Sequence, residues 1–188
     1  MKKALLIASV LLIAVISTAC INNMAVQELN NKAAEFMKKG DYEAAMNRLE
    51  ASVDLDSTMY ETYYNLGIAA TSAKKYEKAI SAFQEGIKIK PDYSDFYYSI
   101  AVAQSSYADE LVEEEVFDNE KEETVKREVS ELDKAKAKEL KAAAADNLAK
   151  YLEMNPDSQD RETVEGLIKD CNEFGNEAQA EETKVFEG

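Results

Sequence analysis

A repeat of about 34 residues is the feature that most constrains the fold of this chain. Four positions recur at this interval, giving four pairs in register: Tyr42 and Tyr76, Ala45 and Ala79, Leu49 and Phe83, and Leu55 and Ile89. The later part of the pattern returns after an interval of 65, which is one period of 34 plus an insert of 31, at Ala144, Leu148, Met154 and Pro156. A fixed period of this length predicts stacked helix-turn-helix units, a fold that normally binds other chains and does no chemistry.

The segment 1–19 has the pattern of an export signal. Lys2 and Lys3 precede an apolar run from Ala4 to Ile16 in which Ser9 is the one polar residue. This run is shorter than the roughly 20 apolar residues that a membrane-spanning helix needs. Small residues follow it, so we predict a signal peptide over residues 1–19 that is cleaved after Ala19.

The charged start, the apolar run and the small residue before Cys20 resemble the signal of a bacterial lipoprotein. The resemblance implies that Cys20 is lipidated and that residues 20–25 link the anchor to the folded part. Attached acyl chains would hold the protein at a membrane of the bacterial cell envelope, on its periplasmic or other extracytoplasmic face. Ser17 and Ala19 also fit ordinary secretion. The alternative is therefore cleavage at the same bond with Cys20 left free.

The net charge of the mature chain restricts the kinds of partner that it can bind. Removing Lys2 and Lys3 with the signal leaves 20 basic and 37 acidic residues, a net charge of −17. Nucleic acid is excluded as an expected partner, because binding to phosphates needs clustered lysine and arginine. If Cys20 is lipidated, Cys171 has no partner for a disulfide, and the fold must depend on packing alone.

The middle unit, residues 60–93, carries the clearest resemblance to a known family. Its small and large residues fall at the spacings of the tetratricopeptide repeat, a helical hairpin of about 34 residues, at Tyr63, Leu66, Gly67, Ala79, Phe83 and Pro91. The resemblance implies an all-α solenoid over residues 26–174, with repeats at 26–59, 60–93 and 94–157. Helical spacing after Pro156 predicts a capping helix over residues 158–174. We expect residues 175–188 to form a flexible tail.

The insert of the third repeat covers about residues 109–139. No glycine or proline occurs from Asp92 to Asn155, so we expect a long helical hairpin with its turn at Asp118 and Asn119. Residues 109–133 contain 12 acidic and 3 basic residues, a net charge of −9. One interpretation is an acidic spike that recruits a basic partner or divalent cations. The other is a solvated hairpin whose charges keep the protein soluble.

The resemblance also implies a partner-binding groove lined by the first helix of each repeat, at its second, fifth, ninth, twelfth and thirteenth positions. We predict these groove residues: Asn30, Met37 and Lys38 from the first repeat, Glu61, Tyr64, Ile68 and Thr71 from the second, and Asp95, Tyr98, Val102 and Ser105 from the third. Four small or polar neighbours, Gln27, Ala34, Ser72 and Ser106, complete the same positions. Asn30 and Asp95 stand where chaperone-binding members of the family have lysines, so an acidic peptide terminus is not the expected ligand. The alternative for Tyr64 and Tyr98 is packing against the adjacent repeat.

Catalysis, cofactors and metals have no motif in this sequence. The chain has 0 histidines, so neither a Ser-His triad nor a histidine metal site can form. Cys171 has no histidine partner and falls on an apolar helical face, where we expect an inert core thiol. We therefore expect no enzyme, no cofactor and no metal site.

These features together predict an envelope-anchored lipoprotein that acts as a protein-protein interaction adaptor or assembly scaffold through its groove. Two alternatives remain at this stage. One is a structural envelope protein that self-associates as a homo-oligomer. The other is an accessory ligand-binding protein of a transport system.

Overall fold

The computed structural model describes residues 23–113, 115–118 and 123–186. The predicted signal peptide and Cys20 lie outside these residues. A first helix covers residues 23–38. It is followed by α2 (Tyr42–Leu55), α3 (Tyr60–Ser72), α4 (Tyr76–Ile89), α5 (Asp95–Val112), β1 (Glu115–Asp118), β2 (Glu123–Lys126), α6 (Glu131–Met154) and α7 (Arg161–Phe186).

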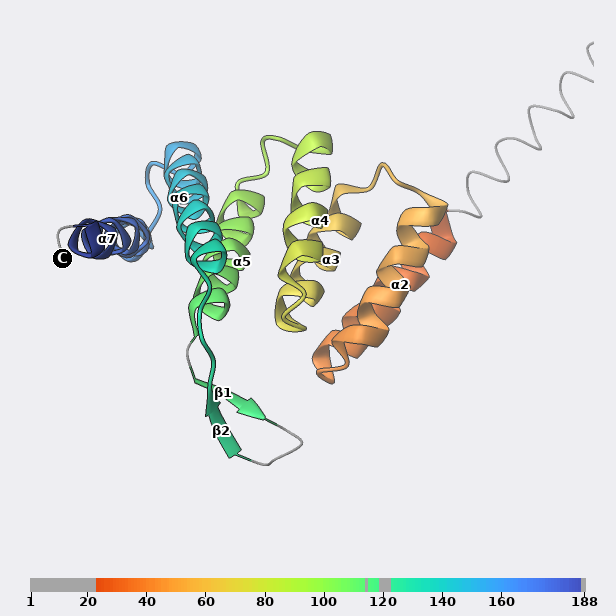
Figure 1. Cartoon of the computed structure of the whole chain (residues 1–188). Coiled ribbons are helices and arrows are strands. Elements are labelled where there is room, and N and C mark those ends of the chain that lie inside the picture. Colours follow the sequence, from red (N-terminus) through yellow and green to blue (C-terminus); the bar gives the residue numbers. More distant parts are fainter. Residues whose placement is uncertain (1–22, 114, 119–122, 187–188) are drawn as a thin grey trace, which may run out of the picture.

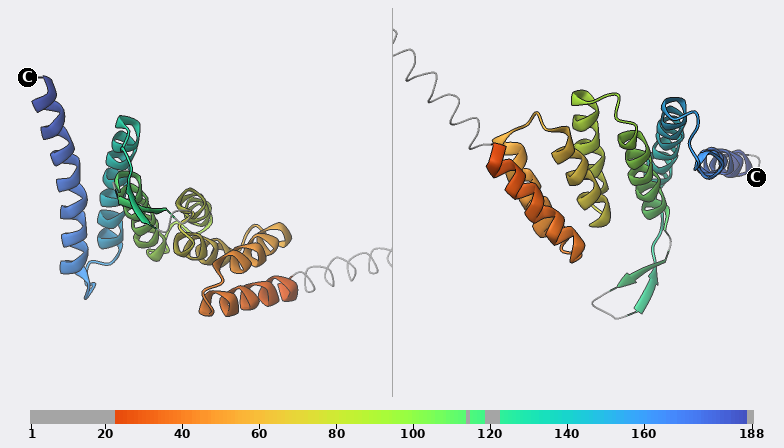
Figure 2. Two further views of the ribbon diagram at one scale, coloured as in Figure 1. Left: turned by 60° about the horizontal axis from the view of Figure 1, so that its bottom comes forward. Right: turned by 180° about the vertical axis from the view of Figure 1, so that it is seen from behind.

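The helices form a single row of antiparallel hairpins (Figure 1). The first helix pairs with α2, α3 pairs with α4, and α5 pairs with α6, while α7 packs on α6 at the end of the row. Two further views show the same order from other sides (Figure 2). The predicted all-α solenoid with a capping helix is thus confirmed, and each hairpin buries its apolar face against its neighbours.

Close helix crossings explain the small residues of the repeat pattern. A Cβ atom added to Gly67 would lie 2.4 Å from the Phe83 ring, and one added to Gly86 would lie 2.2 Å from the Phe96 ring. Both phenylalanines are fully buried. Only glycine allows the backbones of α3 and α4 to approach these rings, because any side chain would overlap them.

The turns inside the first two repeats adopt the same unusual backbone conformation. Gly40 has a φ of 76° and Lys74, one repeat period later, has a φ of 57°. Left-handed backbone suits glycine and is unfavourable for residues with a Cβ atom. The repeat geometry therefore imposes this conformation even where the sequence provides a lysine.

The insert differs from the expected helical hairpin. The described residues between α5 and α6 form a two-stranded antiparallel β-hairpin in which Val116 lies opposite Val125. The lack of glycine and proline was a misleading signal, because valine, phenylalanine and threonine favour strands. The predicted turn is correct to the extent that Asp118 ends β1; Asn119 lies outside the described residues.

Two local contacts set where the helices beside the insert end and begin. Arg127 donates hydrogen bonds to the carbonyl oxygens of Glu110 (3.1 Å) and Leu111 (2.5 Å), which are otherwise free at the end of α5. The Ser130 hydroxyl accepts from the amide of Asp133 at 3.1 Å and starts α6. The returning helix therefore begins at Glu131, well after the predicted turn at Asp118 and Asn119.

The capping helix buries a second apolar cluster against the last repeat. This cluster joins α5, α6 and α7 and contains Ala101, Ala144, Ala145, Leu148, Leu152, Val164 and Cys171. The α7 helix continues to Phe186, whereas we expected a flexible tail from residue 175. Five of the twelve residues 175–186 are alanine or glutamate, which are good helix formers.

Among the described residues, every helix is too short or too polar to span a lipid bilayer.

Candidate partner-binding groove

Five of the predicted groove residues are exposed on the first helices of the repeats. They are Lys38 on the first helix, Glu61 on α3, and Asp95, Tyr98 and Val102 on α5. All five can therefore contact a partner without any rearrangement of the solenoid. The third repeat contributes three of them, so the accessible part of the predicted groove is concentrated on α5.

Tyr98 and Val102 form an exposed apolar pair on α5. Their exposed fractions are 36% and 38%, and a spacing of four residues places them on the same helical face. The Tyr98 ring packs beside the half-buried ring of Tyr151 on α6, with centroids 5.4 Å apart. We call Tyr98, Val102 and Tyr151 the Tyr98 patch. A large aromatic residue left accessible beside a second ring is suited to hold an apolar side chain of a partner.

Tyr64 does not stand free in the groove. Its ring lies 5.6 Å from the ring of Tyr93, the last residue of the same repeat, and 5.5 Å from the ring of Phe96 in the following repeat. The Ser99 hydroxyl lies 3.4 Å from the Tyr64 hydroxyl. The alternative of packing against the adjacent repeat therefore describes Tyr64, whereas Tyr98 remains accessible.

Asn30 has a structural task between the first two repeats. Its side-chain amide donates to the Ser52 hydroxyl at 2.8 Å and to the Thr62 hydroxyl at 3.1 Å. Both hydroxyl residues are fully buried. Because these hydrogen bonds connect the first helix with α2 and α3, the Asn30 side chain stabilises the packing between the first two repeats.

The remaining predicted residues are engaged in the fold. Met37 and Ile68 are partly buried against the main apolar cluster, which joins the first helix with α2, α3, α4 and α5. The Thr71 hydroxyl donates to the carbonyl oxygen of Gly67 at 2.9 Å. The Ser105 hydroxyl accepts from the ammonium group of Lys141 at 2.8 Å. Partner binding by all eleven predicted residues remains a prediction, but these four would have to give up existing contacts.

A buried lysine between α5, α6 and α7 is a feature that the sequence analysis missed. Lys141 has a side chain only 10% exposed and pairs with Asp109 at 2.6 Å. Its ammonium group also lies 5.5 Å from the centroid of the Phe174 ring. The repeat pattern could have pointed to this lysine. Lys141 occupies the position in the third repeat that Tyr76 occupies in the second, where an aromatic residue is expected.

Burial also affects the pKa of the Cys171 thiol, which lies near this lysine. Cys171 on α7 is buried, and burial raises the pKa of its thiol, against smaller lowering effects of Lys141 and Ser105. A raised pKa keeps the thiol protonated and unreactive at neutral pH. This agrees with the expected inert core thiol.

A second polar cluster fixes the geometry of the helices that carry the Tyr98 patch. Lys136 on α6 donates to Glu77 on α4 at 2.8 Å and to the Tyr107 hydroxyl on α5 at 2.7 Å. These bonds lower the pKa of Glu77 and raise the pKa of Lys136. The Tyr107 ring is also stacked on Tyr76, with centroids 5.6 Å apart. Three helices from two repeats are thus connected next to the insert.

Comparisons with known proteins agree with this architecture. The sequence model of the tetratricopeptide repeat matches residues 60–93. A small glutamine-rich tetratricopeptide repeat-containing protein of Mycosarcoma maydis is 29% identical over 62 residues, which are 33% of this chain. The match spans only 18% of the length of that relative.

Solved structures give the same fold over most of the chain. The second tetratricopeptide domain of human RPAP3, in complex with an HSP70 peptide, is similar with a TM-score of 0.58 and 16% identity, covering 79% of this chain and 98% of that domain. The TPR2B domain of yeast Sti1, in complex with an Hsp70 peptide, is similar with a TM-score of 0.54 and 19% identity, covering 80% and 98%. Residues 60–93 are therefore a tetratricopeptide repeat, and the chain folds as a solenoid of the tetratricopeptide type.

Proposed function

We propose that this protein is a non-enzymatic adaptor that binds a segment of another protein on the first-helix face of its solenoid. The observation that supports this most strongly is the Tyr98 patch, where Tyr98 and Val102 remain exposed. The rings of Tyr64 and Phe96, in contrast, are occupied by internal packing. An aromatic surface held on a rigid scaffold favours binding of a peptide or helix with apolar anchors.

Charge defines the class of ligand further. The solved RPAP3 domain is in complex with a peptide that ends in Glu-Glu-Val-Asp. In this protein, the exposed side chains at the predicted groove positions include the carboxylates of Glu61 and Asp95, which would repel such a terminus. We therefore propose that the ligand is a peptide segment with apolar anchor residues, whose remaining side chains are neutral or basic.

The adaptor is proposed to be a lipoprotein anchored through Cys20 in the bacterial cell envelope. The lipoprotein-type signal supports this, and so does the position of the first helix. The described part of that helix starts at residue 23 and Val26 is fully buried, so the packed core already includes a residue six positions after the proposed anchor. Six residues span at most roughly 20 Å, so the solenoid would lie close to the membrane surface.

The same geometry orients the anchored protein. In Figure 1 the first helix begins at the upper edge of the solenoid, and the β-hairpin projects from the lower edge. An anchor at the upper edge would direct the hairpin away from the membrane. The negative charge of the hairpin region favours the same orientation near an anionic lipid surface.

Two variants test the two halves of the proposal separately. Cys20→Ser should move the protein from the membrane fraction to the soluble fraction and leave its circular dichroism unchanged. If the variant stays on the membrane through washing with high salt, the proposed lipid anchor is wrong.

The second variant tests the binding surface. Tyr98→Ala combined with Val102→Ser should abolish recovery of the binding partner from envelope extract. The matched control is Gln84→Ala, an exposed position on α4, which should recover the partner normally.

A further inference from the structure

We propose that the β-hairpin and the hollow at its base form a second docking surface, which binds a basic, extended segment of a partner protein. The hollow has a volume of about 430 Å³. Its lining comes from the turn between α3 and α4, from the start of α4 and from the end of α5: Lys74, Tyr76, Ser106, Asp109, Glu110 and Glu113. This surface lies apart from the Tyr98 patch and needs no contribution from it.

The backbone of the hairpin is incomplete as a sheet. Strands β1 and β2 pair only with each other among the described residues, so each strand has one edge without a β-ladder partner. The hairpin projects from the solenoid (Figure 1). A two-stranded hairpin alone in water is marginally stable, and an exposed edge is suited to accept a further strand. An extended segment would complete the sheet through main-chain hydrogen bonds.

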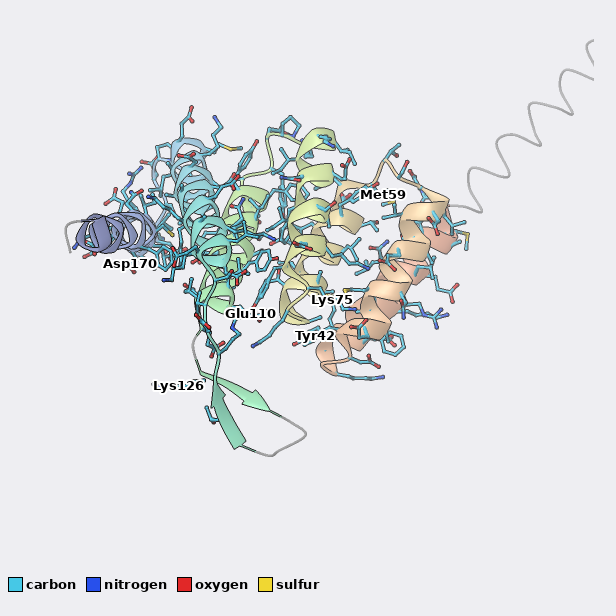
Figure 3. All side chains as sticks on the ribbon, in the orientation of Figure 1. Tyr42, Met59, Lys75, Glu110, Lys126 and Asp170 are labelled. Carbon is cyan, nitrogen blue, oxygen red and sulfur yellow. The ribbon has the colours of Figure 1, made fainter. Side chains whose placement is uncertain are left out.

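The hollow supplies a site for a basic side chain at the start of β1. Glu113, the last residue before the hairpin region, is exposed, and no ion pair with a base is seen for it within residues 23–113, 115–118 and 123–186. Glu110 has only a long ion pair, 3.7 Å from Lys74. Glu110 lies on the side of α5 that faces the α3–α4 turn (Figure 3). Two carboxylates beside the Tyr76 ring suit a lysine or arginine side chain.

The charge of the surrounding chain selects a basic occupant. Residues 109–113, 115–118 and 123–128 contain seven acidic and two basic residues, a net charge of −5. One of the two bases, Arg127, already binds the end of α5. Opposite charge on the partner would speed its association and hold the strand in register.

Binding of short defined peptides to the full chain in detergent micelles tests this inference. The probe is a fluorescent octapeptide of alternating lysine and valine, followed by anisotropy. A lysine-proline octapeptide has the same charge but lacks the amide donor at every second residue and favours the polyproline II conformation over a strand. A glutamate-valine octapeptide can form strands but has the opposite charge. We expect the lysine-valine peptide to bind at least about tenfold more tightly than either control, and to weaken as salt is raised.

Variants locate the binding. Replacement of residues 115–126 by Gly-Ser-Gly-Ser should abolish binding, while the melting temperature of the solenoid stays unchanged. Glu113→Lys should weaken binding about fivefold, whereas Glu162→Lys, with the same charge change on α7, and Tyr98→Ala should have no effect. Equal binding of the lysine-proline peptide would overturn the inference, because charge alone would then explain it. Binding that survives the hairpin replacement would overturn it as well, as would hairpin-dependent self-association that the peptide does not compete with.

Discussion

Substitution of Gly86 by alanine is a direct test of the packing between the second and third repeats. The added Cβ atom would lie 2.2 Å from Cζ of Phe96. Two carbon atoms pack best at roughly 3.5 to 4.0 Å, so the ring would have to move by about 1 Å or more. The ring has little room, because it is fully buried and surrounded by the rings of Tyr60, Tyr64 and Tyr93.

The expected loss of stability combines two opposing effects. Overpacking of a filled core costs about 1 to 3 kcal/mol or more, and the overlap at Phe96 favours the upper end of that range. Replacement of a helical glycine by alanine returns about 1 kcal/mol. The net effect should be a destabilisation of about 2 kcal/mol, which lowers the melting temperature by about 4 to 8 °C in a chain of this size.

The matched control is Gly166→Ala in α7. A Cβ atom added there meets nothing within 4 Å, so the substitution should stabilise the protein by up to about 1 kcal/mol. Urea titration followed by circular dichroism at 222 nm measures both variants in the chain without residues 1–19. Phe96→Leu should reduce the cost of Gly86→Ala by at least about 1 kcal/mol in a double-mutant cycle. Gly86→Ala with wild-type stability, or additive effects with Phe96→Leu, would refute the packing described above.

Four further substitutions have defined outcomes. Lys74→Gly should raise the free energy of unfolding by about 1 kcal/mol, because φ is 57° at this position; a lower urea midpoint than wild type would contradict this. Asp109→Ala should cost about 1 kcal/mol because it leaves the buried Lys141 without its carboxylate, whereas Lys141→Met should be nearly neutral; the opposite order of urea midpoints would show that the ion pair has been misread. Burial and the nearby Asp95 raise the pKa of Tyr93 to about 12, above the ordinary value of about 10. Stability from the neutral phenol is thus present below pH 10 and lost as the pH rises toward 12, so Tyr93→Phe should lose less stability than wild type over this range; equal losses in a urea series at pH 8, 10, 11 and 12 would contradict it.

The sequence was sufficient to predict the solenoid because each repeat position has one dominant physical requirement. Gly67 and Ala79 must be small where helices cross, and Phe83 must be large where the space between them is filled. These requirements act within a single hairpin and repeat at a fixed interval. They can therefore be recognised without knowledge of any long-range contact.

The insert could not be predicted in the same way. Its residues follow no repeat pattern. Its two strands form by pairing with each other, with Val116 opposite Val125. The prediction of a helix at these two valines did not include this pairing. The Arg127 contact with the end of α5 spans 16 residues, and the start of α6 depends on Ser130. Local propensity carried too little information where such contacts decide the structure.

Some of the predicted groove residues are exposed and others are engaged in packing. The contacts that cause this difference cannot be inferred from the position of a residue within its repeat. Tyr64 and Tyr98 occupy equivalent positions, yet the Tyr64 ring packs against the rings of Tyr93 and Phe96, whereas the Tyr98 ring packs against Tyr151. The difference arises because an aromatic residue, Tyr93, ends the second repeat and another, Phe96, stands at the start of the third. The segment after the third repeat provides no aromatic residue at the corresponding places. Tyr98 is therefore exposed because no ring from a further repeat covers it.

Site-specific photo-crosslinking in intact cells tests the proposed adaptor function most directly. A benzophenone amino acid at position 98 should give one dominant crosslinked species, which disappears when Val102→Ser is added. The same probe at Gln84, exposed on α4, should not give that species. If positions 98 and 84 give the same crosslinks, or if neither gives any, the Tyr98 patch is not the partner-binding surface of this protein.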